Sequence, residues 1–236
     1  MRYLFTLFLL SLSFVHFGQN FNVTYGGSFN EVGYCIRQTT DGGYLFLARD
    51  QEFDGFDFYY ETMLVKTDRL GQEEWRKVYD DSLISQYSSG LSPTLDGGYI
   101  FINDYDIIKI DSLGNEEWTL DNDSLFRSVK QTTDSGYIYF GYKRQKHLNI
   151  TTNRYVVLRK TDEQGIEEWY KTYNLDFGHY WVNGVKQTAD GGYIMLGCTA
   201  MHNNGMTDVF LFKLDSQGDS SWVRTYGGGS NEWASG

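Results

Sequence analysis

The sequence QTTDGGY at residues 38–44 recurs three more times along the chain. PTLDGGY follows at residues 93–99, QTTDSGY at 131–137 and QTADGGY at 187–193. Each copy precedes a second motif, K-x-D-x-x-G-x-x-x-W, at residues 66–75, 109–118, 160–169 and 213–222. Two motifs that recur in a fixed order, about fifty residues apart, are typical of a repeat architecture.

The last of these repeats shows how one copy becomes one structural unit. Residues 182–187, 193–198, 209–214 and 221–226 are short apolar or alternating runs, which predict four β-strands. The first pair is separated by Asp190-Gly191-Gly192, an Asp-Gly turn whose residues tolerate positive φ, and the second pair by the turn Asp215-Ser216-Gln217-Gly218. Four such strands, repeated along a chain, predict the blade of a β-propeller. The apolar spacing does not fit a helical solenoid, and the period does not fit a β-helix.

The two motifs place the same residue types in every repeat. We predict that aspartate and glycine shape the hairpin turns, and that each tryptophan packs between adjacent blades and buries roughly 200 Å². The residues of this structural repeat are Asp41, Gly43, Tyr44, Asp68, Gly71, Trp75, Asp96, Gly98, Tyr99, Asp111, Gly114, Trp118, Asp134, Gly136, Tyr137, Asp162, Gly165, Trp169, Asp190, Gly192, Tyr193, Asp215, Gly218 and Trp222.

The expected fold class is all-β, a β-propeller of four-stranded antiparallel blades. The repeats occupy residues 31–79, 86–120, 126–173 and 181–226. Residues 227–236 begin a fifth repeat, because TYGGGSNE at 225–232 matches TYGGSFNE at 24–31. We therefore expect an incomplete ring, from an N-terminal fragment of a longer protein or from a truncated reading frame. The alternative is a four-bladed ring with the last residues as a tail.

Residues 1–18 contain one basic residue and then a short apolar run, which predicts a secretory signal peptide; the alternative is a buried first strand. Cleavage after Gly18 would leave 19 basic and 31 acidic residues, a net charge of 19 − 31 = −12. This acidity disfavours nucleic-acid partners and anionic membrane surfaces. No other stretch is apolar enough to cross a bilayer, so we expect no membrane insertion in the mature chain and a secreted or cell-surface location.

The pattern QTxDGGYI, followed by K-x-D-x-x-G-x-x-x-W and YGG, resembles a repeat found many times in large exported bacterial proteins. Those proteins commonly have the quinoprotein-alcohol-dehydrogenase-like propeller fold, and many end in a sorting domain for type IX secretion. The resemblance covers residues 24–236 and implies a propeller and an exported location. It implies no activity, and the absence of a sorting domain from this sequence leaves the final destination open.

Chemical motifs are sparse, and we predict no catalytic, cofactor-binding or metal-ligating residues. The four histidines share no repeat position, and there is no nucleophile elbow, phosphate loop or HExxH motif. One aspartate per separate blade does not converge on a calcium ion. The paired acids at 73–74, 116–117 and 167–168 are interpreted as solvated strand ends. Cys35 and Cys198 lie at different repeat positions, so a bridge would require the first and fourth blades to be neighbours.

The sequence therefore predicts a non-catalytic β-propeller module that binds an unknown protein or glycan ligand, or that serves as a structural spacer. A ligand site is expected at one mouth of the ring, on the links at residues 49–60, 143–153 and 201–207. The alternatives are a quinone-dependent or sugar-active enzyme fragment and a truncated product without function. A quinone-dependent dehydrogenase of similar fold ordinarily has eight blades, a vicinal cysteine pair and a catalytic aspartate in the central funnel, and this fold-level analogy is weak.

Overall fold

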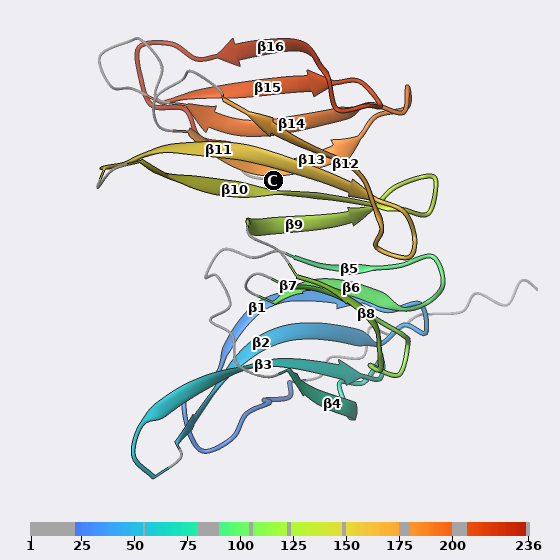
Figure 1. Cartoon of the computed structure of the whole chain (residues 1–236). Helices are drawn as coiled ribbons and strands as arrows, with labels where there is room; N and C mark the ends of the chain where they lie inside the picture. The colour runs from blue at the N-terminus through green and yellow to red at the C-terminus, as the bar shows by residue number, and fades with distance from the viewer. Residues whose placement is uncertain are drawn as a thin grey trace, which may run out of the picture.

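The computed structural model describes residues 22–53, 55–79, 90–103, 106–121, 124–147, 150–174, 180–199 and 207–234. The elements in these ranges are sixteen β-strands, which form four antiparallel sheets of four strands. Each sheet keeps the order of the chain, so the protein is an all-β propeller of four described blades (Figure 1).

Each blade is a meander of four consecutive strands. The strands of blade 1 are β1 (Val32–Gln38), β2 (Tyr44–Phe53), β3 (Phe58–Thr67) and β4 (Glu73–Tyr79). Those of blade 2 are β5 (Leu91–Pro93), β6 (Tyr99–Asn103), β7 (Asp106–Ile110) and β8 (Glu116–Leu120). Those of blade 3 are β9 (Leu125–Gln131), β10 (Tyr137–His147), β11 (Ile150–Thr161) and β12 (Glu167–Tyr173). Those of blade 4 are β13 (Tyr180–Gln187), β14 (Tyr193–Thr199), β15 (Asp208–Leu214) and β16 (Ser220–Tyr226).

The turn between the first and second strands of a blade is held by its aspartate. In blade 1, Asp41 Oδ1 accepts hydrogen bonds from the Gly43 backbone N–H at 2.9 Å and from Thr39 Oγ1 at 2.5 Å. Gly42 between them has a φ of 84°, which an L side chain rarely adopts. The same aspartate contacts recur in the other three blades, which explains the repeated T-x-D-G-G sequence.

Blade 3 departs from this turn, because Ser135 stands where the other blades have glycine and has a φ of 70°. A left-handed conformation costs a non-glycine residue about 1 kcal/mol, partly offset by the higher unfolded-state entropy of glycine. We expect Ser135→Gly to raise the free energy of unfolding by about 0.5 kcal/mol in urea denaturation. Ser216→Gly, in a turn position without positive φ, serves as the control and should not stabilise; equal gains from both would contradict this explanation.

The turn between the third and fourth strands uses the second motif. Asp68 Oδ1 accepts the backbone N–H groups of Leu70 at 2.7 Å and Gln72 at 2.8 Å, and Gly71 has a φ of 77°. The equivalent aspartates make the same pair of contacts in the other blades. An aspartate that satisfies two backbone donors, followed by a left-handed glycine, fixes a tight hairpin.

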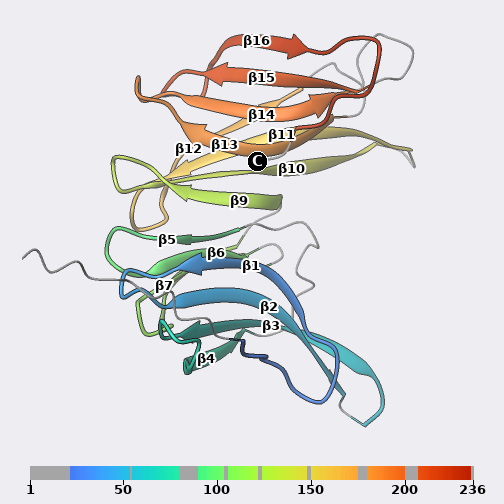
Figure 2. The ribbon, with the colours of Figure 1, turned by 180° about the vertical axis from the view of Figure 1, so that it is seen from behind.

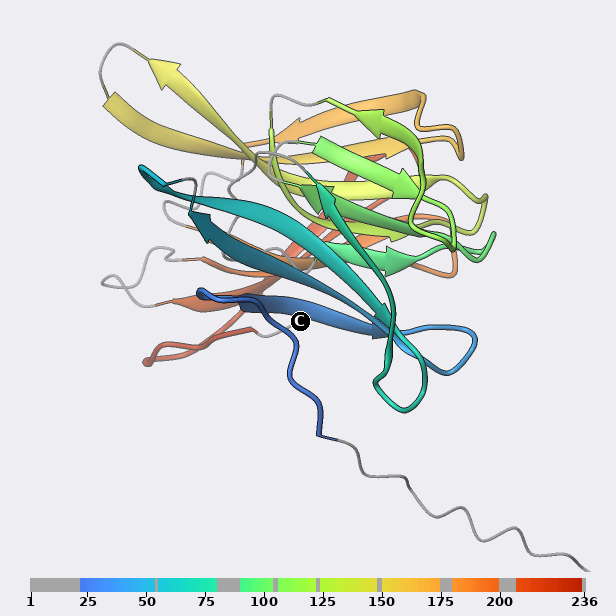
Figure 3. The same cartoon turned by 90° about the horizontal axis from the view of Figure 1, so that it is seen from below.

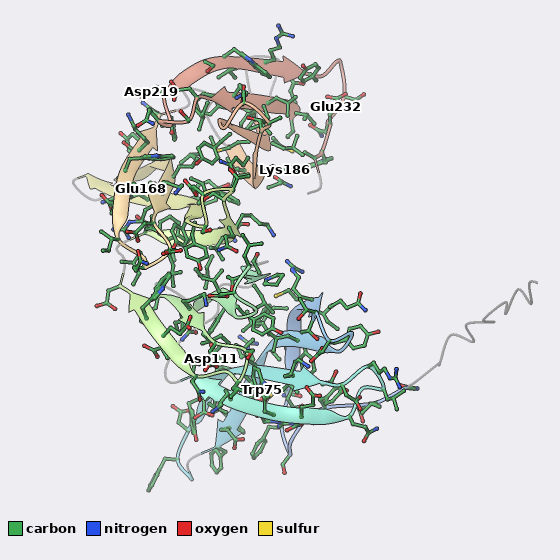
Figure 4. The ribbon with its side chains drawn as sticks, turned by 90° about the vertical axis from the view of Figure 1, so that its right-hand side faces the viewer. Trp75, Asp111, Glu168, Lys186, Asp219 and Glu232 are labelled. Carbon is green, nitrogen blue, oxygen red and sulfur yellow. The ribbon has the colours of Figure 1, made fainter. Side chains whose placement is uncertain are left out.

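The hydrophobic core lies mainly at the interfaces between neighbouring blades, which we call joints. One cluster joins apolar side chains of blades 1 and 2, a second joins blades 2 and 3, and a third joins blades 3 and 4. The first strands of successive blades also contact one another, β1 with β5, β5 with β9 and β9 with β13. Figure 2 shows the stacked sheets from behind, and Figure 4 shows that they follow an arc. Each blade is therefore stabilised by its neighbours.

Two of the links that the sequence predicted to carry a ligand site are extensions of the strands. β2 and β3 continue as a ladder to the pair Phe53–Phe58, and β10 and β11 continue to the pair His147–Ile150. In the first of these hairpins, Phe53, Phe58, Tyr59 and Tyr60 suit a strand, and the polar residues beside them obscured the pattern. Both hairpins extend from the end of the sheets opposite the aspartate turns (Figures 1 and 3). The third predicted link, at 201–207, lies outside the described residues except for Thr207.

Candidate functional site

A lysine of the second motif is buried in each of the first three blades. The side chains of Lys66, Lys109 and Lys160 are 4%, 2% and 3% exposed. In blade 3, Lys160 Nζ lies 3.0 Å from Asp134 Oδ2 and 2.8 Å from Glu168 Oε2, and it donates to the Thr161 carbonyl at 2.9 Å. The ammonium group thereby connects both turns of the blade, which provides the partners that a buried charge needs.

A β-bulge brings the glutamate to this lysine. In blade 3 the ladder pairs Lys160 with Trp169 and Thr161 with Glu167, which leaves Glu168 as the extra residue. The same irregularity occurs at the equivalent position of every blade. Because a bulge redirects the side chain of its extra residue, Glu168 can reach the face that carries the lysine. The second acid of each pair is therefore a partner of the buried lysine as well as a half-exposed strand end, which corrects the sequence interpretation.

Blade 4 has a reduced version of the same arrangement. Ser221 stands at the bulge position, and Lys213 Nζ lies 3.0 Å from Asp190 Oδ2. The Lys213 side chain is 14% exposed, compared with 2–4% in the other blades. Loss of the glutamate thus accompanies a more accessible lysine.

The aspartates of these turns remain ionised at neutral pH. Hydrogen bonds from Lys66, then Thr39 and the Gly43 N–H, hold the pKa of Asp41 well below its usual range. At Asp134, burial alone would raise the pKa, but hydrogen bonds from Thr132 and Lys160 outweigh it and lower the pKa. These side chains therefore carry a negative charge at the aspartate-turn end of the sheets.

Each tryptophan of the first three blades packs against the glycine turn of the following blade. A Cβ built on Gly165 would lie 3.0 Å from the Trp118 ring, and Trp75 and Trp169 face Gly114 and Gly218 in the same way. Trp118 also packs edge-on against Tyr137, with ring centroids 5.7 Å apart. The tryptophans therefore lie at the joints between blades, while Trp222 on blade 4 is 39% exposed.

Hydrogen bonds also cross these joints. Gln131 of blade 3 accepts the Leu95 N–H of blade 2 at 2.7 Å, and Gln187 of blade 4 accepts the Thr133 N–H of blade 3 at 2.9 Å. The Tyr173 hydroxyl donates to the Gly218 carbonyl at 2.6 Å. The glutamine of the first motif therefore fixes the position of one blade against the preceding turn.

Two joints contain equivalent pockets, both built from the repeat motifs. The pocket between blades 2 and 3 has a volume of about 370 Å³, and the pocket between blades 3 and 4 has about 440 Å³. Both volumes fall in the range of small-ligand sites. The first is lined by Leu95, Asp96, Glu117, Trp118, Gln131, Ser135, Tyr137, Glu163 and Gln164. The second is lined by Asp134, Lys160, Glu168, Trp169, Gln187, Gly191, Tyr193, Ser216 and Gln217.

The two pockets share an indole, carboxylates and two amides. In the second pocket, Trp169 and Glu168 come from blade 3, whereas Gln187 and Gln217 come from blade 4. Glu168 is 46% exposed, so its carboxylate remains accessible beside the lysine. Burial raises the pKa of Tyr193 to about 12, so its hydroxyl is neutral. The pocket therefore combines an aromatic surface with hydrogen-bonding groups of both kinds.

The joint between blades 1 and 2 differs in composition. Pro93 replaces the first-motif glutamine, and Leu113 replaces the glutamine of the second turn. Leu113 is 64% exposed, and proline offers no side-chain hydrogen bond. The two amides therefore distinguish the two later joints, and Leu113 offers a matched control position.

The described part of the chain places the other sequence candidates away from these pockets. Cys35 and Cys198 are free thiols on blades 1 and 4, and Cys198 Sγ accepts the Ala234 N–H at 3.0 Å. Among the described residues there is no group of three or more histidine, cysteine or acidic side chains that could hold a metal ion. Within the same residues, no helix is long and apolar enough to span a bilayer. Of the links predicted to bind ligand, 49–60 and 143–153 belong to the hairpins at the opposite end.

The buried lysines and the glutamines belong to the repeat motifs, but the sequence alone assigned them no role. One feature of the sequence could have predicted that the lysines are buried and paired: a charged residue lies inside an apolar strand in all four copies, as in DIIKI of β7. Such a residue needs an acidic partner close by, and each copy supplies one in the adjacent turn. No comparable signal revealed the pockets, because they form only when two blades meet.

Comparisons with known proteins support the fold and go no further. No protein-family model matches the chain, and no curated protein matches it significantly. A protein of unknown function from Bacteroides caccae aligns with a TM-score of 0.51 and 10% identity, over 85% of this chain and 69% of that one. Streptogramin B lyase aligns with a TM-score of 0.43 and 12% identity, over 82% and 68% of the two chains. BamB from Moraxella catarrhalis gives 0.32 and 11%, over 77% and 78%. At these similarities none of the three indicates anything about function.

Proposed function

We propose that this protein is an exported, non-catalytic β-propeller module that binds a neutral glycan in the pockets between its blades. The observation that carries the proposal is the recurrence of one pocket composition at two successive joints. Indole, carboxylate and amide groups suit a ligand with apolar CH faces and many hydroxyl groups. The signal-like residues 1–18 and the resemblance to exported bacterial repeats support export. We expect mass spectrometry of the mature protein to find Gln19 as its first residue; an uncleaved N-terminus would contradict export.

The charge of the pockets favours a neutral ligand. Asp134 and Glu168 outweigh Lys160 in the second pocket, and three acids line the first. Like charges brought together in a partly desolvated site repel one another, which disfavours sulfated or uronic-acid glycans. Two pockets at successive blade interfaces of one chain would also allow two units of one polysaccharide to bind together, which raises the apparent affinity.

A glycan array tests the proposal. We expect the protein to bind a subset of neutral oligosaccharides and to bind sulfated glycans at least tenfold more weakly. The double variant Gln164→Ala/Gln217→Ala removes one exposed amide from each pocket and should weaken neutral-glycan binding about fivefold at each pocket, because each lost hydrogen bond costs about 1 kcal/mol. Leu113→Ala, at the equivalent turn of blade 2, should bind like the wild type.

A variant with a shortened hairpin shows whether the ligand binds in the pockets or on the long hairpins. Unchanged binding by the double variant, together with loss of binding when residues 49–60 are replaced by a short turn, would place the ligand at the other end of the sheets. Binding only to anionic glycans would also overturn the proposal.

A further inference from the structure

The two ends of the arc have complementary faces. Each described joint is formed by one face of a blade and the opposite face of the blade that follows it in the chain. We call the first of these the trailing face and the second the leading face. Blade 4 has a trailing face and blade 1 a leading face that no described blade covers (Figure 4). In a stack of similar repeats, such faces can pack against a further repeat.

The trailing face of blade 4 is more exposed than its equivalents. Its residues are Ile194, Leu196, Leu211, Trp222 and Tyr226. The three aliphatic side chains are half-buried, whereas the equivalent residues of blade 3 lie in the joint with blade 4 and are at most 2% exposed. Trp222 is 39% exposed and Tyr226 is 49% exposed. A continuous apolar surface with two accessible aromatic rings is typical of an interaction site.

The tyrosine that ends the fourth strand forms a hydrogen bond across a joint. The Tyr79 hydroxyl of blade 1 donates to the Gly114 carbonyl of blade 2 at 3.1 Å. The Tyr173 hydroxyl of blade 3 makes the same contact with Gly218 of blade 4. Both acceptors are the glycine of the second motif in the following blade. Tyr226 is the equivalent tyrosine of blade 4, so its natural acceptor is the second-motif glycine of another blade.

On blade 1, Tyr25 occupies the place of a preceding blade's tyrosine. Its hydroxyl donates to the carbonyl of Gly71, the second-motif glycine of blade 1. Its ring packs against Phe46 of the leading face, with centroids 4.9 Å apart, beside the buried Met63. Tyr25 lies in the sequence TYGG at residues 24–27, which is identical to residues 225–228 around Tyr226. The leading face of blade 1 therefore already accepts the segment that ends blade 4.

Residues after blade 4 make a matching contact on its trailing face. The Ala234 N–H donates to Cys198 Sγ at 3.0 Å, at the same repeat position where the Val182 N–H of β13 donates to the Tyr142 hydroxyl of blade 3. Ala234 thus takes the position of the first strand of a following blade. Both open faces therefore make the contacts of a joint, through short segments of the same chain.

We propose that the trailing face of blade 4 binds the leading face of blade 1 in a second copy of this chain, so that two copies close a ring. Tyr226 of one copy then replaces Tyr25 on Gly71 of the other, and β1 replaces Ala234. Each copy carries both faces, so the contact occurs twice around a two-fold axis, and head-to-tail contacts form a ring when the rotation closes. Two copies of four blades give eight, a number known for propellers.

The dimer would also complete a pocket that blade 4 alone leaves unfinished. Asp190, Lys213 and Trp222 are the equivalents of blade 3 residues that line the pocket between blades 3 and 4. Gln38 of the second copy stands at the repeat position of the glutamine that blade 4 supplies to that pocket. Dimerisation requires no glycan, so failure of either proposal leaves the other unaffected.

Sedimentation equilibrium of the mature protein between about 1 and 100 μM tests the assembly. We expect the mass to rise with concentration to that of two chains and to stop there, because a closed ring has no open face left. A monomer throughout this range would assign the blade 4 face to another partner and would overturn the proposal. A mass that grows beyond two chains would show open head-to-tail association, and it would overturn the closed ring.

Two tyrosines in identical sequences should have opposite effects on this dimer. Tyr226→Ala removes a contact from both new joints and should raise the dissociation constant about tenfold, as should Trp222→Ala, because buried aromatic anchors dominate interfaces. Tyr25→Ala removes the segment's competing contact with Gly71 and should lower the apparent dissociation constant about threefold, because a larger fraction of the chains is then able to dimerise.

A variant at the other end of the sheets is the control. Phe56→Ala removes a 96% exposed ring from the β2–β3 hairpin and should leave the dissociation constant unchanged. Misfolding does not explain stronger dimerisation, so the Tyr25→Ala result stands even if Trp222→Ala or Tyr226→Ala proves unstable. Wild-type dimerisation by both Trp222→Ala and Tyr226→Ala, or weaker dimerisation by Tyr25→Ala, would show that these faces do not form the contact.

Discussion

Replacing Gly136 by alanine is expected to lower the free energy of unfolding by about 3 kcal/mol. A Cβ at this position would lie closer than 3.0 Å to the Thr161 carbonyl oxygen and to Lys160 Nζ, a separation that real Cβ atoms do not show. The carbonyl belongs to the neighbouring strand, so the sheet itself would have to move. The added methyl group would also displace the buried ammonium from its partners.

Gly184→Ala is the matched control for this prediction. Gly184 also lies in a blade, on β13, but a Cβ there would have no heavy atom within 4 Å. Alanine should therefore be neutral or slightly stabilising at this position, because it lowers the entropy of the unfolded chain. Urea denaturation of both variants measures the difference. Equal stability of the two variants would contradict the close approach as the reason for the glycine that ends each D-x-G motif.

Removing the buried lysine of blade 3 should have the second largest effect. Lys160→Met keeps the length of the side chain but removes the ammonium that joins Asp134, Glu168 and the Thr161 carbonyl. Breaking a fully buried ion pair costs about 3–5 kcal/mol. The two carboxylates are 55% and 46% exposed and can regain water, so we expect a smaller loss of about 2 kcal/mol in the free energy of unfolding.

In blade 4, adding the missing acid should increase stability. Ser221→Glu restores at the bulge the acid that the other blades have, and Lys213 already lies beside Asp190. We expect this change to stabilise the protein by about 0.5 kcal/mol, the value of a partly exposed ion pair, and the gain should disappear in the Lys213→Met background. A gain that persists without Lys213 would show that the glutamate acts through another contact.

The sequence predicted the strands and their turns well where all four repeats share the same pattern. In blade 4, residues 182–187 and 193–198 were predicted as strands, and β13 and β14 cover Tyr180–Gln187 and Tyr193–Thr199. Four aligned copies show which positions alternate and which carry turn residues, and local backbone preference then determines the hairpins. The all-β propeller of four-stranded blades follows from this pattern.

The long hairpins and the pockets could not be predicted in the same way. The segments around Phe53 and Phe58 have no equivalent in blade 2, so the repeats offered no alignment there. Their strand conformation comes from pairing with each other, which a polar sequence does not reveal. The pockets depend on how one blade is fixed against the next, through contacts such as that of Gln187 with Thr133. The packing of one blade against the next is part of the tertiary structure, so it cannot be predicted from the sequence of a single repeat.

The structural position of the bound ligand tests the proposed function most directly. Crystals of the protein should be soaked with the neutral glycan that gives the highest signal on the array. We expect electron density for a sugar at both joints, against Trp118 and Trp169 and within reach of Gln164 and Gln217. Sugar density at the β2–β3 and β10–β11 hairpins, with both joints empty, would contradict the proposal that the repeated joints are the binding sites.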